Sequence, residues 1–364
     1  MHLTFPPLHR TAACAAALAL AALHGQAQAA LCTWTGTGGT SAMTNTANWD
    51  CGGGPTTGDS LVFPASAPSK SVNADLADAF VDATFAAGYD LSGTLRVRNL
   101  TDIAAPFSAS GAVIEGEYTG SVAIHGSGLA EIGNLDGIAA PGTIQVTGGA
   151  HARINATVVA GEGPITLGAG SRLSAGQNAK ASVLNVAAGG TLAVSEPPTG
   201  AVAGSTVGSL TVTTGTATLA AGSTLEYLAS TTYDSGHLVA QNGLALNGAT
   251  LRIVVEDPAN PDAIGFMRTL AAYGDSSKLT GRFAGLPATG ALVQASNAPG
   301  IWYSVSYGFN SNSFVQITRV AAPVAPPPGP GGAAPIPVLA PAGLALLSAL
   351  VGGLGLARRR KKSE

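Results

Sequence analysis

The 364-residue sequence contains few charged and few aromatic residues. Asp, Glu, Lys and Arg together make up 10% of it and Phe, Trp and Tyr 5%, whereas about a quarter of an ordinary globular sequence is charged. The shortage of rings argues against a fold built on aromatic cores, and 49 glycines favour many short strands joined by tight turns. Six of the 17 basic residues but one of the 20 acidic residues lie in the terminal segments. The acidic, lysine-poor middle of the chain therefore excludes a nucleic-acid-binding protein.

Catalytic and metal-binding motifs are also missing. The three histidines beyond residue 30 are His125, His151 and His237, and none has a carboxylate companion nearby in sequence. No HExxH, GxSxG, P-loop or Cys-x-x-Cys spacing occurs, and neither do calcium-binding glycine–aspartate repeats. We therefore expect no metal site, no cofactor and no enzymatic activity.

Two groups of charged residues leave alternatives open. Asp75, Asp78 and Asp82 would share one face of a helix, as a solvated face or a cation site. Asp136, Arg153 and Arg172 are spaced by about one coil of a stacked-strand fold, and could form a column. They favour solvated surface charges, with a catalytic site of a carbohydrate lyase or hydrolase as the alternative.

The N-terminal residues 1–29 have the pattern of a secretory signal peptide. Arg10 ends a weakly basic stretch, Thr11 to Leu23 is apolar, and Ala27-Gln28-Ala29 is a small-x-small cleavage site. The apolar run is shorter than the roughly 20 residues of a transmembrane helix. This pattern predicts export through the Sec machinery, with cleavage after Ala29.

The next segment, residues 30–64, is predicted to be an N-terminal cap module. It contains Cys32 and Cys51, which we expect to form a disulfide in an exported protein. Trp34 and Trp49 are expected to cover that disulfide as an apolar cap, with a sugar-binding aromatic pair as the alternative. Residues 65–91 are assigned to a connecting segment.

Residues 92–322 contain a recurring unit: a short alternating strand, a turn centred on Gly, and another strand that begins near a Leu. The closing leucines of four such units, Leu173, Leu192, Leu225 and Leu251, follow one another at unequal intervals. Short strands with glycine turns are what a parallel β-helix, or β-solenoid, requires, with coils of unequal length. A Gly-rich β-sandwich is the alternative. The fold prediction is therefore an all-β protein whose Gly-rich solenoid follows a disulfide-bonded cap.

The C-terminus combines a Pro/Gly linker at 323–335, an apolar run from Val338 to Ala357, and a basic cluster. The apolar run is long enough for one transmembrane helix, and the cations after it are expected to stay in the cytoplasm. The tail at 336–364 resembles the IPTL family of bacterial sorting signals, relatives of the signals processed by exosortases. In the motif, Val338 replaces Thr, and Ala342 stands where the family has Trp. The residues assigned to the sorting motif are Ile336, Pro337, Val338, Leu339, Gly343, Arg358, Arg359 and Arg360.

This resemblance implies an exosortase-like partner in the inner membrane. The protein would then be anchored there with its ectodomain in the periplasm, or sorted to the cell surface. A plain membrane anchor is the alternative.

Residues 233–320 resemble the closing coils of autotransporter passenger β-helices. The resemblance rests on short stretches such as Gly243 to Val254, Leu279 to Phe283 and Phe314 to Ile317. It implies a solenoid fold and surface display. The functional hypothesis is an adhesion, surface or matrix protein whose ligand is a surface polysaccharide or a host or matrix component.

Overall fold

The computed structural model describes residues 29–116, 122–137, 143–154, 163–175, 179–195, 208–233, 236–274, 276–308 and 313–324. It divides the chain into two compact units, Met1–Ala321 and Ala322–Glu364. The predicted signal peptide up to residue 28 and the linker and sorting tail from residue 325 lie outside the described residues.

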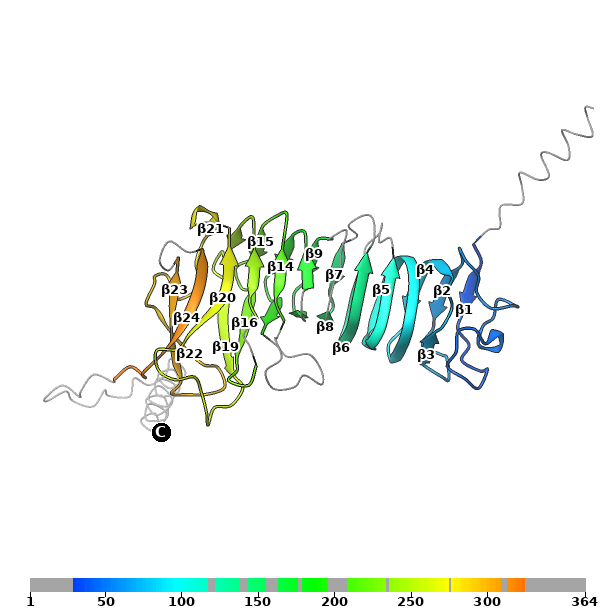
Figure 1. Cartoon of the computed structure of the whole chain (residues 1–364), viewed down its shortest axis with the longest axis horizontal. Coiled ribbons are helices and arrows are strands. Elements are labelled where there is room, and N and C mark those ends of the chain that lie inside the picture. Colours follow the sequence, from blue (N-terminus) through cyan, green and yellow to red (C-terminus); the bar gives the residue numbers. More distant parts are fainter. Residues whose placement is uncertain are drawn as a thin grey trace, which may run out of the picture. The chain divides into compact units, whose positions relative to one another are not determined.

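The first unit is an all-β structure in which each coil of the chain pairs in parallel with the next (Figure 1). One ladder contains β1 (Leu31–Thr33), β2 (Ser60–Phe63), β4 (Ala79–Phe85), β5 (Tyr89–Gly116), β6 (Val122–Gly137), β7 (Ile144–Val146), β9 (Ile165–Leu167), β12 (Leu184–Val186), β15 (Ala217–Leu219), β18 (Leu244–Ala245) and β21 (Leu279–Thr280). A second contains β3 (Ser71–Ala74), further parts of β5 and β6, β8 (Ala150–Ile154), β10 (Arg172–Ala175), β13 (Thr191–Val194), β16 (Thr224–Ala229) and β19 (Thr250–Val255).

A third group of strands forms a separate sheet. Its strands β11 (Ala179–Ala181), β14 (Leu210–Val212), β17 (Leu238–Ala240) and β20 (Met267–Tyr273) are parallel. Then β24 (Phe314–Val320), β23 (Trp302–Tyr307) and β22 (Leu292–Gln294) continue it in antiparallel order. Two short 3-10 helices, Thr46–Asn48 and Ser276–Lys278, interrupt the strands. This arrangement is consistent with the predicted β-solenoid.

The four leucines singled out in the sequence lie side by side in the second ladder. Leu173 pairs with Leu192, Leu192 with Leu225, and Leu225 with Leu251. All four side chains are buried. Each coil thus covers the apolar face of its neighbour, and the predicted unequal coil lengths are confirmed by the pairing register.

Glycine turns stack above one another between these strands. The amide of Gly170 donates to the carbonyl of Gly189, and the amide of Gly189 donates to that of Gly222. All three residues have a positive φ, between 72° and 79°, which glycine adopts without a steric penalty. The turns therefore continue the hydrogen-bonded stack between the ladders.

The expected Cys32–Cys51 disulfide is present in the cap, with 5.1 Å between the Cα atoms. Trp34 and Trp49 are both buried, and their rings meet edge to face with centroids 5.2 Å apart. Cys32 and both tryptophans belong to one apolar cluster, as expected for a cap. Burial removes both rings from any ligand, so the alternative of a sugar-binding aromatic pair is wrong.

A cluster of aromatic side chains lies beside the cap. Phe63 stacks on Phe85 with centroids 4.3 Å apart, and Phe85 packs against Phe107 of the next coil at 5.0 Å. The sequence as a whole has few rings, but several of them form a local aromatic core beside the cap.

Parallel pairing joins β1, β2, β4 and β5 in succession. The ladder therefore runs across residues 64 and 91 without a break, and the division into domains at these positions stays a prediction.

The helical face suggested for the aspartate triplet does not exist. Ala79–Phe85 is strand β4, and it contains Asp82. Asp75 accepts bonds from the amide and hydroxyl of Thr44, and Asp78 accepts one from the hydroxyl of Thr57. These aspartates therefore fasten the cap segment to the following coil.

An antiparallel hairpin covers the other end of the second ladder. The amide of Ser296 donates to the carbonyl of Ile253 on β19, and the side chain of Asn297 bonds to the amide and carbonyl of Val255. These bonds occupy backbone groups of β19 that a further coil would otherwise pair. In the described part of the chain, no helix is long and apolar enough to cross a membrane; the segment expected to do so, Val338 to Ala357, lies outside it.

Candidate functional site

The strand register aligns a column of outward positions along the second ladder. Inward positions on either side of the column hold apolar residues such as Leu192 and Val194. The aligned outward positions are Glu131, Arg153, Ser174, Ala193, Glu226 and Arg252. Charged side chains of opposite sign therefore come from different coils to one row, in which Glu131, Ser174, Ala193 and Glu226 are buried.

The charges in this column pair with one another and with Arg172, two residues before Ser174. Arg153 Nη1 lies 3.9 Å from Glu131 Oε1. Arg172 Nη2 reaches across the intervening strand β13 to lie 2.5 Å from Glu226 Oε1, and Arg252 bonds to the other oxygen of Glu226. The Glu131 and Glu226 side chains are almost buried. These carboxylates therefore join coils to each other.

The alternative of a column of Asp136, Arg153 and Arg172 does not form, and Arg153 and Arg172 are paired with glutamates rather than being solvated surface charges. Arg172 aligns with His151, and Arg153 aligns with Ser174. The coil that separates β8 from β10 is slightly longer than the interval between the two arginines, so Arg172 falls short of the position beside Arg153. The backbone of Asp136 pairs with Glu115 on β5, and its side chain lies outside the described residues.

Two histidines have partners that sequence proximity could not reveal. His125 Nε2 lies 2.8 Å from Asp102 Oδ1 of the preceding coil, with both side chains nearly half exposed. His151 Nε2 lies 2.7 Å from the hydroxyl of Ser174. For His237, burial lowers the pKa of the ring. No group of three or more His, Cys, Asp or Glu that could hold a metal ion occurs among the described residues.

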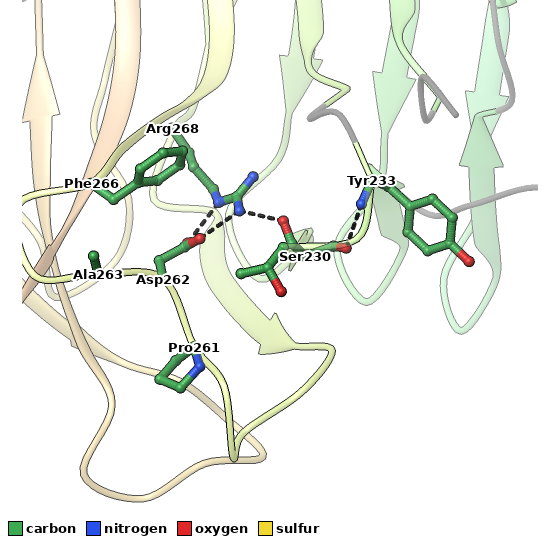
Figure 2. A pocket seen from close by; sticks show the side chains of 8 residues that line it. Ser230, Tyr233, Pro261, Asp262, Ala263, Phe266 and Arg268 are labelled. Atoms are coloured by element: carbon green, nitrogen blue, oxygen red, sulfur yellow. Dashed lines mark hydrogen bonds and ion pairs between the residues drawn. The ribbon is translucent and has the colours of Figure 1, made fainter. Parts of the chain in front are cut away.

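A pocket of about 300 Å³ opens between two loops of neighbouring coils (Figure 2). The first loop follows β16, and the second joins β19 to β20. The strands β16 and β19 pair up to Ala229 and Val255, so both loops leave the stack at the same edge. The lining residues are Ser230, Thr231, Tyr233, Pro261, Asp262, Ala263, Phe266 and Arg268.

An ion pair forms the buried wall of this pocket. Arg268 donates from Nε and Nη2 to the two oxygens of Asp262, at 2.7 and 2.6 Å, and Nη2 also bonds to the carbonyl of Ser230. Both side chains are almost completely buried. Burial alone would lower the pKa of Arg268, but the hydrogen bonds and charge of Asp262 raise it above the ordinary arginine value. The guanidinium of Arg268 therefore keeps its charge, and its hydrogen bonds go to the oxygens of Asp262 and the carbonyl of Ser230.

The rim of the pocket carries an exposed ring. Phe266 is 49% exposed, and the Arg268 guanidinium lies 4.9 Å from its centroid. On the opposite side, the hydroxyl of Ser230 accepts from the amides of Thr232 and Tyr233, which holds the first loop in a turn. The Tyr233 ring points away from Arg268 (Figure 2). Sequence reasoning missed this pocket, because its two loops come from different coils and neither contains a motif.

Comparison with known families identifies the type of signal at the C-terminus. A family model of the IPTL-CTERM motif matches residues 334–361. The tail is an IPTL-type sorting signal. The match covers the predicted motif from Ile336 to Leu339, the apolar run and the arginine cluster through Lys361. No curated protein sequence and no solved structure matches the chain at a significant level.

The IPTL signal determines the cellular setting of the protein. Signals of this type are recognised by an exosortase-type enzyme, so the protein is exported and belongs to the cell envelope. The positions of the sorting motif lie outside the described residues. The column of paired charges and the pocket between the loops thus belong to the exported part of the protein.

Proposed function

We propose that the protein is a cell-envelope display protein whose stacked β-coils bind extracellular saccharide, with the IPTL signal holding or sorting it there. The observation that carries the proposal is the pocket beside Phe266. Its volume of about 300 Å³ is at the small end of the range typical of ligand sites. A pocket of this size accommodates one sugar unit of a longer chain.

The chemistry of the wall favours a neutral, hydroxyl-rich ligand. A ligand carboxylate would compete with Asp262 for Arg268, and a ligand cation would compete with Arg268 for Asp262. Breaking a buried ion pair costs about 3–5 kcal/mol. Hydroxyl groups can instead bond to the lone pairs that Asp262 still offers, because a carboxylate accepts about four hydrogen bonds and Arg268 supplies two of them.

The exposed ring suits the apolar face of a sugar. Phe266 is held in place by the guanidinium beneath it, so little side-chain freedom is lost when a ligand packs on it. Thr231, an exposed residue that also lines the pocket, adds a hydroxyl group. An aromatic platform with nearby hydroxyl and carboxylate groups supports binding of neutral polysaccharide.

The paired charges support binding rather than turnover. The acids Glu131 and Glu226 each contact arginine from another coil. An acid that holds coils together in this way is a poor general acid, because it must stay in place between its partners. The competing hypothesis is a tethered carbohydrate lyase or hydrolase, and the experiment must be able to detect such an activity.

The test uses the full chain purified from cells in detergent. Calorimetric titration with cellohexaose, maltohexaose and chitohexaose should detect binding of at least one of them, and hexagalacturonate should bind more weakly. Replacing Phe266 by Ala should weaken binding about tenfold, while Ile264→Ala, in the same loop but outside the pocket lining, should not change it. Binding that survives Phe266→Ala would reject this pocket.

The same samples are assayed for new reducing ends and unsaturated products. We expect none over hours. Release of product that is abolished by a single substitution among Asp136→Ala, Arg153→Ala, Arg172→Ala and Glu131→Gln would replace the display function by the enzyme alternative, since loss of one catalytic acid or base costs about 10²–10⁴ in rate.

A further inference from the structure

The backbone nitrogen of Ala30 is bound by a buried carboxylate. It lies 2.8 Å from Asp59 Oδ1, and the carbonyl of Ala30 accepts from the amide of Ser60 at 2.9 Å. Ala29 is exposed. Ala30 lies immediately before strand β1 and shortly before the disulfide at Cys32.

Asp59 is held in an environment that favours its ionised form. The residue is 7% exposed, and its second oxygen accepts from the amide and hydroxyl of Thr56 at 2.8 and 3.0 Å. Burial raises the pKa of the carboxyl, but the amides of Thr56 and Ala30 and the Thr56 hydroxyl outweigh it, so the pKa lies below the ordinary value. Within the described ranges, the oxygens of Asp59 accept bonds from backbone and hydroxyl donors and from no Lys or Arg. A buried negative charge without a cation is costly.

The predicted signal-peptide cleavage site ends at Ala29, so processing would turn this same nitrogen into the N-terminus of the mature chain. We propose that export processing completes the N-terminal coil: the new α-ammonium group of Ala30 forms an ion pair with Asp59. The inference goes beyond the proposed function and rests on cleavage after Ala29 rather than on saccharide binding.

The reaction that supplies the charge is peptide hydrolysis by a signal peptidase. Water adds across the Ala29–Ala30 bond, the carboxylate leaves with Ala29, and the Ala30 amine takes up a proton. An ordinary α-amine has a pKa of about 7.7–8.0. Before cleavage the Ala30 amide offers one N–H to Asp59; afterwards the ammonium offers three N–H groups and a positive charge, which is the stronger interaction.

The location gives this ion pair a structural consequence. Strand β1 is the first strand of the parallel ladder, and pairs through Cys32 with Leu61 of β2. Asp59 immediately precedes β2 at Ser60–Phe63. The ion pair thus fastens the start of β1 to the start of β2, whereas the disulfide fastens β1 to Cys51. Cleavage after Ala29 and oxidation of the two cysteines then both hold the first coil closed.

The decisive experiment measures the α-amine in the processed full chain. The protein is purified from cells, its N-terminal residue is determined by mass spectrometry, and the pKa of the amine is obtained from the pH dependence of its reaction with an acylating reagent. We expect Ala30 as the first residue and an amine that titrates clearly above the ordinary range. Asp59→Asn should return the value to the ordinary range.

Asp50→Asn is the matched control. Asp50 accepts from the amide of Thr33 at 2.6 Å in the same module, whereas the nitrogen of Ala30 donates to Asp59, so the amine should titrate as in the unaltered protein. If Asp59→Asn does not fold, the unaltered protein still tests the proposed ion pair. Acetylation of its α-amine should lower the melting temperature at pH 7, and should have no effect at a pH above the pKa of the amine in the folded protein. A first residue other than Ala30, or an ordinary amine pKa in the unaltered protein, overturns the proposal.

Discussion

Two buried tyrosines, one in the coils beside the cap and one in the C-terminal hairpin, differ in whether the hydroxyl has a hydrogen-bond partner. Tyr89 is fully buried beside the cap and donates to the carbonyl of Pro64 at 2.9 Å. Tyr303 is fully buried in β23, and its hydroxyl has no hydrogen-bond partner in the part of the chain that the structure describes. A bonded buried hydroxyl stabilises a fold, whereas one without a partner costs desolvation.

Replacing each tyrosine by phenylalanine should therefore have opposite effects. Tyr89→Phe should lower the free energy of unfolding by about 1 kcal/mol, because the Pro64 carbonyl loses its donor. Tyr303→Phe should be neutral or stabilising. Denaturant unfolding of the two variants checks this, and a larger loss for Tyr303→Phe would contradict the assigned contacts.

The same tyrosines predict a loss of stability in alkali. Burial raises the pKa of Tyr89 and of Tyr303 to about 12, against about 10 in the unfolded chain. Their contribution is complete below pH 10 and is lost as pH rises from about 10 to about 12, at up to about 1.4 kcal/mol per pH unit for each group. Melting curves across this range should show a shallower slope for Tyr89→Phe than for the unaltered protein. Equal slopes would exclude Tyr89 as a contributor.

At the scale of the strand, the leucine ladder, formed by Leu173, Leu192, Leu225 and Leu251, packs neighbouring coils against each other. Leu192 lies between Leu173 and Leu225 and is fully buried. Its neighbour Thr191 points outward and is partly exposed. Substitutions at these two adjacent positions therefore compare the effects of an inward and an outward side chain on one strand.

Leu192→Ala should destabilise the stack by about 2–5 kcal/mol, because it leaves a cavity between two other leucines. Thr191→Ala should change the free energy of unfolding by less than about 0.5 kcal/mol. Hydrogen exchange would locate the effect of the leucine variant in β10, β13 and β16. Similar effects of the two substitutions would mean that Leu192 does not face the core.

The sequence was sufficient to predict the features that follow from the repeated units. It was not sufficient for the contacts made by long side chains or for the sites formed by loops. Leu173, Leu192 and Leu225 recur after similar glycine turns, so their alignment was predictable, as was the pairing of Cys32 with Cys51 in an exported chain. The contact of Arg172 with Glu226 spans two coils and follows from the length of arginine rather than from any repeat. The strand at Ala79–Phe85 was missed because aspartate spacing suggested a helix.

The pocket was missed for a similar reason. Asp262 and Arg268 are close in sequence, but Ser230, whose carbonyl accepts from Arg268, lies one coil earlier. The separation between the two loops is set by coil length, which differs from one step of the leucine ladder to the next. A pocket assembled from unequal coils has no fixed sequence signature.

At the scale of the whole molecule, the protein combines a stack of parallel coils with an IPTL-type sorting signal at residues 334–361. The coils carry the paired charges and the pocket. We propose that the tail, and not the coils, keeps the protein in the cell envelope.

The most direct test is fractionation of cells that produce either the full chain or a chain lacking residues 336–364. Antibody against the coils should detect the full chain in the envelope fraction, and the truncated chain in soluble form in the periplasm or medium. Oxidised Cys32 and Cys51 in both forms, shown by resistance to alkylation before reduction, would establish that export and folding are intact. Retention of the truncated chain in the envelope at the level of the full chain would show that the coils, and not the tail, keep the protein there.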